Sequence, residues 1–377
     1  MVSITASVPQ VEPVPERKVT AVPTVPQVPA LTESQIAQFK RDGFLVLPGA
    51  LDAELCRRAR DDMWEAIGTY LPRMKRDDPS TWTPITDEEQ TNFPVAYHGG
   101  QPYFGGGNTR YYVRNGTKEF MLDLGPRALW TVAEQLLGKG TVVWPAGLDE
   151  SGSTSGPCLM SDEAMEVLYG QDLETWPSLP TFKTQTLRLP QQGIELLTGQ
   201  GTRGLYCTLP NSPDPGPNWR GAHSDGSSYG RFRLNFAAYI DDLPPASGGF
   251  TVWPGSHTRI WEHHWKTFHA GETHVGRRHN SRKLGGHERI ADPIVEAVKA
   301  DTEAVDTYGP TGSVVLWHHK ILHVPGQNTS NDVIRQATIY GYMKSPEALS
   351  DEMAMTDAGG DIWRDWSDDV RAIEAAS

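Results

Sequence analysis

The sequence predicts a mainly β protein with flanking helices, whose strands form a sandwich or jelly roll. From about residue 181 onward, short runs rich in β-branched and aromatic residues are separated by Pro and Gly, a pattern typical of such antiparallel sheets. Ahead of that point, apolar residues recur at helical spacing instead. With 377 residues, 38% of them hydrophobic and 21% charged, the chain can bury a substantial core.

The ordered part is expected to begin near residue 31. Residues 1–30 repeat Val and Pro and contain few large apolar side chains, which favours a disordered or polyproline-like tail. We therefore expect a single domain over residues 31–377. Residues 258–306 interrupt the strands and are rich in His and charged groups. A connection of this length predicts a helical insertion or lid.

Three helices and one strand are expected before the β-rich part. Thr32-Glu33-Ser34-Gln35 has the pattern of a capping box, and Gly43 is suited to end that helix in the left-handed region. The apolar run Phe44–Leu47 predicts a buried strand. Asp52 is expected to cap the second helix, and Pro126 precedes the third. The expected apolar stripes are Ile36 and Phe39; Cys56, Ala59, Met63 and Ile67; and Leu129, Val132, Ala133 and Leu136. The later strands are expected at Thr184–Leu189, Gly204–Leu209, Arg233–Ile240, Gly249–Trp253, Ser313–Trp317 and Gln336–Tyr342.

The composition excludes several classes of function. A formal net charge of −13 argues against a nucleic-acid surface, since phosphate binding needs concentrated Lys and Arg. No apolar run approaches the length of a membrane span, and the N-terminal residues lack the features of a secretory signal. Cys56, Cys158 and Cys207 are widely spaced, which predicts buried thiols rather than a disulfide framework. We expect a cytoplasmic protein that acts on a small molecule without nucleic-acid or membrane partners; the oligomeric state stays open.

His223-Ser224-Asp225 is the most informative motif. Residues i and i+2 of a strand share a face, so the imidazole and the carboxylate can reach one metal ion. With a second imidazole from His323, they would occupy one face of Fe(II) and leave the opposite positions for an organic cosubstrate and O2. Arg335, twelve positions past His323, offers a planar guanidinium for the remote carboxylate of a 2-oxo acid. The pattern predicts an Fe(II)/2-oxoglutarate oxygenase.

Three blocks of the chain resemble the phytanoyl-CoA dioxygenase family of Fe(II)/2-oxoglutarate-dependent oxygenases. They are residues 31–56; residues 221–257, with His223-X-Asp225, Asp241-Asp242, Gly248-Gly249 and Pro254-Gly255-Ser256-His257; and residues 309–337, with His323, Gly326, Asn328, Ser330 and Arg335. The resemblance implies a double-stranded β-helix (jelly roll, cupin-like) and the cofactors Fe(II), 2-oxoglutarate and O2. It also implies that His223, Asp225 and His323 are the iron ligands and that Arg335 binds the distal carboxylate of 2-oxoglutarate.

Three positions bear on the reaction and on the cosubstrate pocket. Related halogenases have a small residue in place of Asp225, so the retained carboxylate favours oxygenation over halogenation. The family often has Ser where this chain has Pro325, and Trp where it has Ala237. We therefore expect Arg335 to anchor the cosubstrate in a pocket whose walls differ from those of the family.

Other histidines compete with His323 for the metal. We favour His323 because the run from Gly326 to Arg335 follows it at the spacing of the family. His318 and His319 are expected to pack or to form hydrogen bonds, and His257 to stabilise its turn. The histidines of the insertion are expected on a polar lid rather than in a second metal site; they are His263, His264, His269, His274, His279 and His287.

Candidate substrate contacts lie in the loop Gly105–Tyr112. Its glycines lead into a cation and aromatic rings, so Arg110 and Tyr111 could close over the iron and bind an acidic substrate. An inert glycine-rich loop is equally expected from the same residues.

We hypothesise that the protein oxidises a C–H bond of a small molecule while 2-oxoglutarate is converted to succinate and CO2. Hydroxylation of an amino acid or of a secondary-metabolite intermediate is the first expectation. The same cofactors could instead serve desaturation or oxidative cyclisation. A noncatalytic jelly-roll ligand-binding protein is the third possibility, although it would have no need for both the metal ligands and Arg335.

Overall fold

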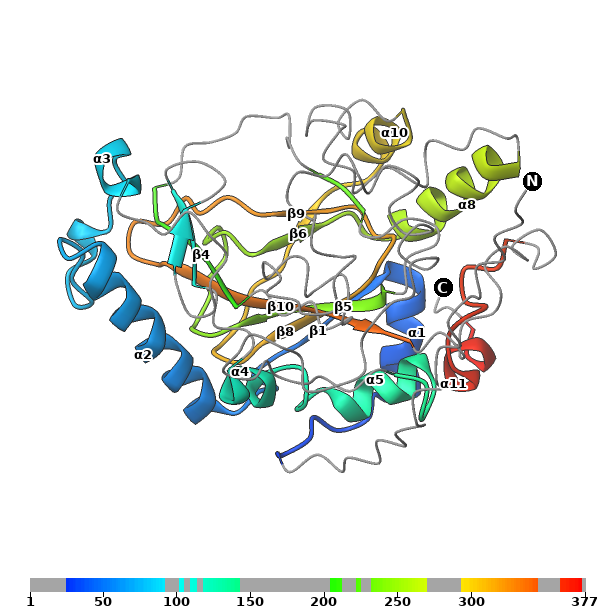
Figure 1. Cartoon of the computed structure of the whole chain (residues 1–377). Coiled ribbons are helices and arrows are strands. Elements are labelled where there is room, and N and C mark those ends of the chain that lie inside the picture. The colour runs from blue at the N-terminus through cyan, green and yellow to red at the C-terminus, as the bar shows by residue number, and fades with distance from the viewer. Residues whose placement is uncertain are drawn as a thin grey trace, which may run out of the picture.

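The computed structural model describes residues 25–91, 102–104, 109–113, 118–142, 204–211, 222–224, 232–269, 293–344 and 360–374. Within them, two antiparallel sheets lie one above the other (Figure 1). The larger has the order β1 (Phe44–Leu47), β8 (Val314–His318), β5 (Phe232–Tyr239), β10 (Arg335–Met343), β4 (Leu205–Thr208), β3 (Arg110–Val113), β2 (Pro102–Phe104); the smaller has β7 (Val305–Asp306), β6 (Phe250–Val252), β9 (His323–Pro325). Strands far apart in sequence are neighbours, as in a double-stranded β-helix, so the predicted fold class is confirmed.

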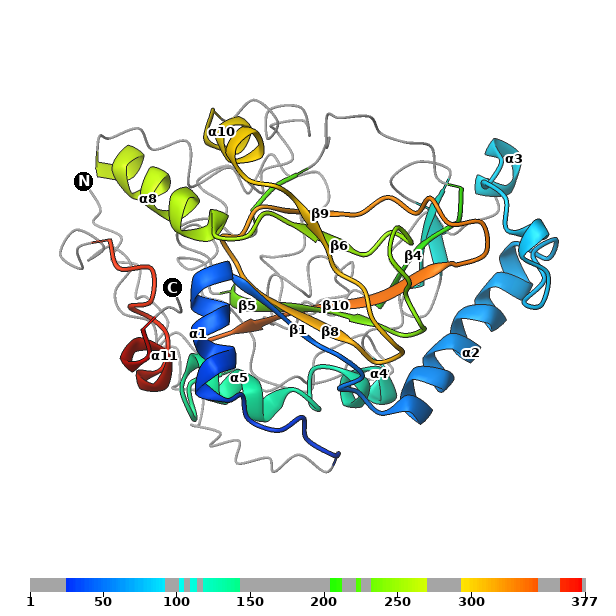
Figure 2. The ribbon, with the colours of Figure 1, turned by 180° about the vertical axis from the view of Figure 1, so that it is seen from behind.

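The two faces of the larger sheet pack against different layers. Figures 1 and 2 show helices α4 (Glu119–Leu124) and α5 (Trp130–Leu137) on the side away from β6 and β9. On β10, Tyr340 and Tyr342 belong to the core shared with the helices, whereas Ala337 belongs to the core between the sheets. Because alternate residues of a strand face opposite sides, the residues of β10 two positions from Ala337 face the space between the sheets. Those directly next to Ala337 face the helices.

Helix α1 (Glu33–Asp42) begins and ends as the sequence predicts. The Thr32 hydroxyl accepts a hydrogen bond from Gln35 N, and the Gln35 side chain accepts one from Thr32 N, which completes the capping box. Gly43 follows with φ of +80°, and a Cβ there would lie 2.4 Å from Nδ1 of His257. Glycine is therefore required for both its conformation and its lack of a side chain.

The other predicted elements also form within the described residues. Helix α2 (Ala53–Tyr70) is capped by Asp52, whose carboxylate accepts from Leu55 N at 2.8 Å, and its predicted apolar stripe is buried. The stripe of α5 is buried as well, with Leu129 as the N-cap residue. Strands β4, β5, β6, β8 and β10 each differ by one residue at either end from the expected ranges. The expected strand Thr184–Leu189 lies outside the described residues.

The predicted start of the domain needs a correction. Val28 is buried and its N–H donates to Ala128 O at 2.8 Å, while Gln27 Nε2 donates to Arg127 O at 2.8 Å. The packed chain thus includes residues before 31, because Gln27 and Val28 of the expected tail form hydrogen bonds with the residues that precede α5. Residues 1–24 lie outside the described part.

The C-terminal segment 360–374, with α11 (Asp368–Ala372), was not anticipated. Ser367 N donates to Leu136 O at 3.0 Å, Lys40 Nζ donates to Val370 O at 2.8 Å, and the rings of Trp366 and Phe39 have centroids 5.4 Å apart. The segment therefore joins α1 to α5, and Figures 1 and 2 both show α11 beside them.

The insertion 258–306 is helical where it is described. Helix α8 (Ser256–His269) starts at its beginning and α10 (Pro293–Asp301) lies near its end, and the two helices contact each other. Residues 270–292 lie outside the described residues. None of the helices described in this structure is long and apolar enough to cross a membrane.

Candidate metal centre

Backbone pairing brings His223 and His323 together. Strand β9 pairs with β6 on one side and with residue 223 on the other. The two histidines exchange both backbone hydrogen bonds, each 2.9 Å long, and their ring centroids are 4.4 Å apart. Residues that exchange both bonds across an antiparallel pair project their side chains to the same side. The first predicted ligand and the last are therefore neighbours.

The imidazole of His323 is held in one orientation and one tautomer. Its Nδ1 lies 3.0 Å from the carbonyl oxygen of Ile321. A carbonyl oxygen only accepts hydrogen bonds, so Nδ1 carries the hydrogen and Nε2 carries the lone pair. The ring stacks on Phe250 at 4.8 Å and lies 5.5 Å from Trp317. Such outer contacts are those that orient a metal-binding histidine.

The third predicted ligand, Asp225, lies outside the described residues. The three residues before it, Ala222, His223 and Ser224, are described, and Ala222 and Ser224 are buried. Among the described residues no group of three His, Cys, Asp or Glu side chains could hold a metal ion. The His223 and His323 rings nevertheless suit two of the three positions of a facial iron site, because they are adjacent and His323 Nε2 has its lone pair.

Arg335 is a buried cation with little to balance it. Its side chain is 4% exposed, and Nη2 donates to the Thr208 hydroxyl at 2.7 Å. Its Nε has no hydrogen-bond partner among the described residues. Burial, and then the neighbouring charge of Arg110, hold the pKa of Arg335 below its ordinary value. A buried charge is costly without a counter-ion, so this position suits a carboxylate such as that of 2-oxoglutarate.

Arg335 faces the space between the two sheets. It shares its side of β10 with Ala337, which lies in the inter-sheet core. The same core contains Phe250 and Trp317, which contact the ring of His323. The histidine and the arginine, separated in sequence by the turn between β9 and β10, are therefore directed into one compartment.

Arg110 lies in register with Arg335 across strand β4. In the sheet register, Thr208 of β4 is the partner of Arg335 on one side and of Arg110 on the other. Residues in register across neighbouring strands share a face, so both guanidinium groups project from the inter-sheet side. Arg110 is half-buried and forms no ion pair within the described part of the chain. Sequence reasoning missed Thr208, because only the strand register reveals that it links the two arginines.

Tyr111 is placed on the opposite face, which corrects its prediction as a substrate contact. It is 1% exposed and belongs to the core between the larger sheet and the helices. Burial raises the pKa of its hydroxyl well above the ordinary value. The physical reason is the alternation of a strand: with Arg110 directed inward, its neighbour must be directed outward.

The loop between β9 and β10 is fixed by Asn328. Its Nδ2 donates to Val333 O at 2.7 Å and to Thr208 O at 3.1 Å, and its Oδ1 accepts from Ser330 N at 3.2 Å. A Cβ on Gly248 would lie 3.0 Å from the Asn328 side chain. The contacts of Asn328 with Gly248, Ser330 and Val333 thus fix the path of the chain between β9 and Arg335.

The two departures from the family pattern fall beside this compartment. Ala237 is 2% exposed and belongs to the inter-sheet core. Pro325 is in β9, opposite Phe250. Both positions therefore lie beside the candidate centre.

The competing histidines lie elsewhere. His318 stacks on Trp366 with ring centroids 5.1 Å apart, and its Nδ1 accepts from Lys320 N at 3.0 Å. His319 is also fully buried, with its ring edge-on to Trp261. His257 Nε2 donates to Lys40 O at 3.0 Å, and burial lowers its pKa to about 4. Of the insertion histidines only the side chain of His263 is described; it is half-buried on α8.

Residues 183–337 match the family described as phytanoyl-CoA dioxygenase (PhyH). This range contains the three predicted iron ligands, His223, Asp225 and His323, and the predicted cosubstrate-binding residue, Arg335. No curated protein matches the chain.

Several solved structures have low similarity to the chain. AviO1 from Streptomyces viridochromogenes Tue57 is 15% identical, with a TM-score of 0.34, 84% of this chain covered and 96% of the other. The non-heme alpha ketoglutarate dependent carbocyclase SnoK from nogalamycin biosynthesis is 14% identical, with a TM-score of 0.35 and coverages of 85% and 86%. EctD from S. alaskensis with 2-oxoglutarate and 5-hydroxyectoine is 11% identical, with a TM-score of 0.34 and coverages of 85% and 82%. Values this low carry no conclusion about the reaction of this chain.

The fold and the family match define an enzyme of the Fe(II)/2-oxoglutarate-dependent oxygenases, with Fe(II), 2-oxoglutarate and O2 as cofactors. Within that class the chain is similar to the PhyH family over residues 183–337, which make up less than half of its length.

Proposed function

We propose that this enzyme hydroxylates a C–H bond of a small molecule while 2-oxoglutarate is converted to succinate and CO2. In this proposal His223, Asp225 and His323 hold the iron, and Arg335 holds the distal carboxylate of the cosubstrate. One observation carries it: a histidine pair and a buried, uncompensated arginine face the same space between the sheets.

The residues of the chain have separate roles in this mechanism. Fe(II), when bound, supplies the activation of O2. Ile321 O fixes the His323 ring so that Nε2 is presented to the metal. Thr208 holds one Nη of Arg335, which leaves the other donors of the guanidinium for a carboxylate. Phe250 and Trp317 pack against His323 and exclude water from that side.

Hydroxylation is favoured over halogenation because the sequence retains Asp225 as a third protein ligand. Desaturation and oxidative cyclisation use the same ligand set. Mass analysis separates the outcomes, since hydroxylation adds one oxygen atom to the product and desaturation removes two hydrogen atoms.

The substrate of this proposal carries an anionic group that Arg110 binds. Arg110 is level with Arg335 and lacks a partner among the described residues, so a second anion can balance it. Arg110→Gln should raise the KM for an acidic substrate about tenfold, the cost of one charge-assisted contact, and Arg110→Lys should restore part of it. An equal rise in the KM for 2-oxoglutarate would instead make Arg110 part of the cosubstrate site.

The iron site is tested without a known substrate. Fe(II) titrated anaerobically with 2-oxoglutarate should give a weak visible charge-transfer band in the wild type. His323→Ala should abolish the band, because one of the two imidazoles is lost. His263→Ala is the matched control, since His263 lies on α8 and is expected to leave the band intact. A band that survives His323→Ala would contradict the assignment.

A further inference from the structure

A cavity lies on the helical side of the larger sheet. Its volume is about 360 Å³, within the range of ligand pockets. Its walls come from α2, from the segment that follows α2, from the turn after β5 and from the loop that leads into β10. Figures 1 and 2 show α2 and α8 at opposite ends of the described part of the molecule, so this cavity lies far from α8.

The cavity is separated from the candidate iron site by the sheet itself. Gln336 lines it and directly follows Arg335 on β10. Successive residues of a strand face opposite sides, and the register partner of Gln336 is Cys207, which belongs to the core shared with the helices. A molecule bound here would therefore not be the one that is oxidised.

Two indole rings form an aromatic wall. Trp64 of α2 and Trp82 have ring centroids 5.6 Å apart and planes inclined at 44°. Trp82 follows the short helix η1 (Pro79–Thr81), and its Nε1 donates to Lys75 O at 2.7 Å. Both rings line the cavity.

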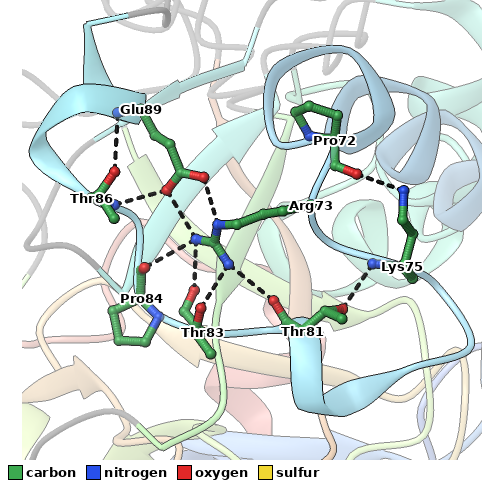
Figure 3. A network of polar contacts seen from close by, with 8 residues as sticks. All are labelled: Pro72, Arg73, Lys75, Thr81, Thr83, Pro84, Thr86 and Glu89. Carbon is green, nitrogen blue, oxygen red and sulfur yellow. Dashed lines mark hydrogen bonds and ion pairs between the residues drawn. The ribbon is translucent and has the colours of Figure 1, made fainter.

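A polar network holds this wall in place (Figure 3). The Arg73 guanidinium donates to Glu89 at 2.5 and 3.0 Å, to the Thr83 hydroxyl at 2.7 Å and to Pro84 O at 3.0 Å. Arg73, which follows α2, also donates to Thr81 O at 3.0 Å, and Glu89 belongs to α3 (Asp87–Gln90). One side chain therefore contacts the chain on both sides of Trp82. The aromatic wall is preorganised rather than formed by the ligand.

Most charges around the cavity are already balanced. Arg60 pairs with Asp241 at 2.5 Å, and Arg76 pairs with Asp61 at 2.7 Å. The carboxylate of Asp242 accepts from the Thr311 N–H at 2.7 Å and from its hydroxyl at 2.8 Å.

Two acceptors of the lining are left without partners among the described residues. Asp332 lines the cavity and forms no ion pair or hydrogen bond with the described residues. Gln336 is 5% exposed, and its Oε1 is buried with no hydrogen-bond partner in the described part of the protein. Among the buried donors of the lining, Nε of Arg60 has no partner in the described part of the protein. An uncompensated carboxylate, a buried acceptor and two indole faces together suit a cation, and the Arg60 donor suits a hydroxyl on it.

We propose that this cavity is a binding site for a small organic cation, such as an amino alcohol. The ammonium group lies against Trp64 and Trp82 and is neutralised by Asp332.

Choline is a suitable probe, and its neutral isostere 3,3-dimethylbutan-1-ol is the matched control ligand, since the two differ only in charge. In isothermal titration calorimetry of the full chain, choline should bind at one site. The isostere should bind about fivefold more weakly or not at all, because the cation–π and ionic contributions are lost.

Asp332→Asn locates the site, since Asp332 is on an exposed loop and its loss leaves the core intact. This variant should weaken choline binding about fivefold. Glu303→Gln, an equal charge change on an exposed loop elsewhere, should bind choline as the wild type does. Equal binding of choline and its isostere, an unchanged affinity in Asp332→Asn, or no binding of choline would each overturn the proposal.

Discussion

At the scale of single residues, Arg335 is the proposed anchor of the cosubstrate. Arg335→Lys keeps the charge but loses the planar fork and the bond to Thr208. We expect the KM for 2-oxoglutarate to rise about tenfold or more, with a smaller effect on kcat. Thr208→Val removes one hydrogen bond that orients the guanidinium but leaves the guanidinium itself, so the rise should be about threefold. Succinate release measured against 2-oxoglutarate concentration gives both values, and a wild-type KM for Arg335→Lys would exclude Arg335 as the anchor.

His257 makes stability depend on pH. Burial lowers its pKa from 6.5 to about 4 in the folded protein, so between these values the unfolded chain binds more protons. The free energy of unfolding is thus unaffected above pH 6.5 and falls as the pH drops toward 4, by roughly 2 kcal/mol at pH 5. His257→Gln keeps a donor for Lys40 O but does not titrate. Urea unfolding gives the free energy of unfolding at pH 8 and at pH 5. Between these pH values it should fall by roughly 2 kcal/mol less in His257→Gln than in the wild type. An equal fall in the two proteins would mean that His257 does not cause the pH dependence.

At the scale of elements, the C-terminal segment fastens α1 to the sheet. Trp366 is 3% exposed and packs on Phe39 and His318. Trp366→Ala should lower the free energy of unfolding by about 3–5 kcal/mol, because it leaves a cavity among buried rings. Tyr308, which is 52% exposed, provides the control: Tyr308→Ala should change stability by less than about 0.5 kcal/mol. Similar urea midpoints for Trp366→Ala and Tyr308→Ala would show that the C-terminal segment contributes little to the free energy of unfolding.

At the scale of the whole molecule, the sheet and the helices share one core. Cys56 on α2 and Cys207 on β4 both belong to it, and burial raises the pKa of each thiol to about 12. Neither should react with a thiol reagent at pH 8 while the protein is folded. In Cys158→Ser, both should be modified at one common rate that rises with urea, since the core opens as a unit. A much faster reaction of Cys56 would mean that the helical layer opens separately.

Local chemistry made much of the fold predictable. The caps at Thr32 and Asp52 and the left-handed Gly43 depend on neighbours within a few residues, so the sequence determines them directly. The five later strands were placed within one residue because Pro and Gly bound them. Segment 360–374 was missed, because its few apolar residues become informative only when α1 and α5 lie beside them.

For the site, the sequence by itself determined which residue types are available: an His-X-Asp motif, a distal histidine and an arginine, all within residues 183–337. Only the tertiary structure decided that His223 pairs with His323, that Thr208 connects Arg335 with Arg110, and that Tyr111 faces the helices. The physical reason is that strand register is set by partners far away in the chain, and a shift of one residue would exchange the two faces. The cavity beside Trp64 and Trp82 is of the same kind, since its walls come from four separate segments.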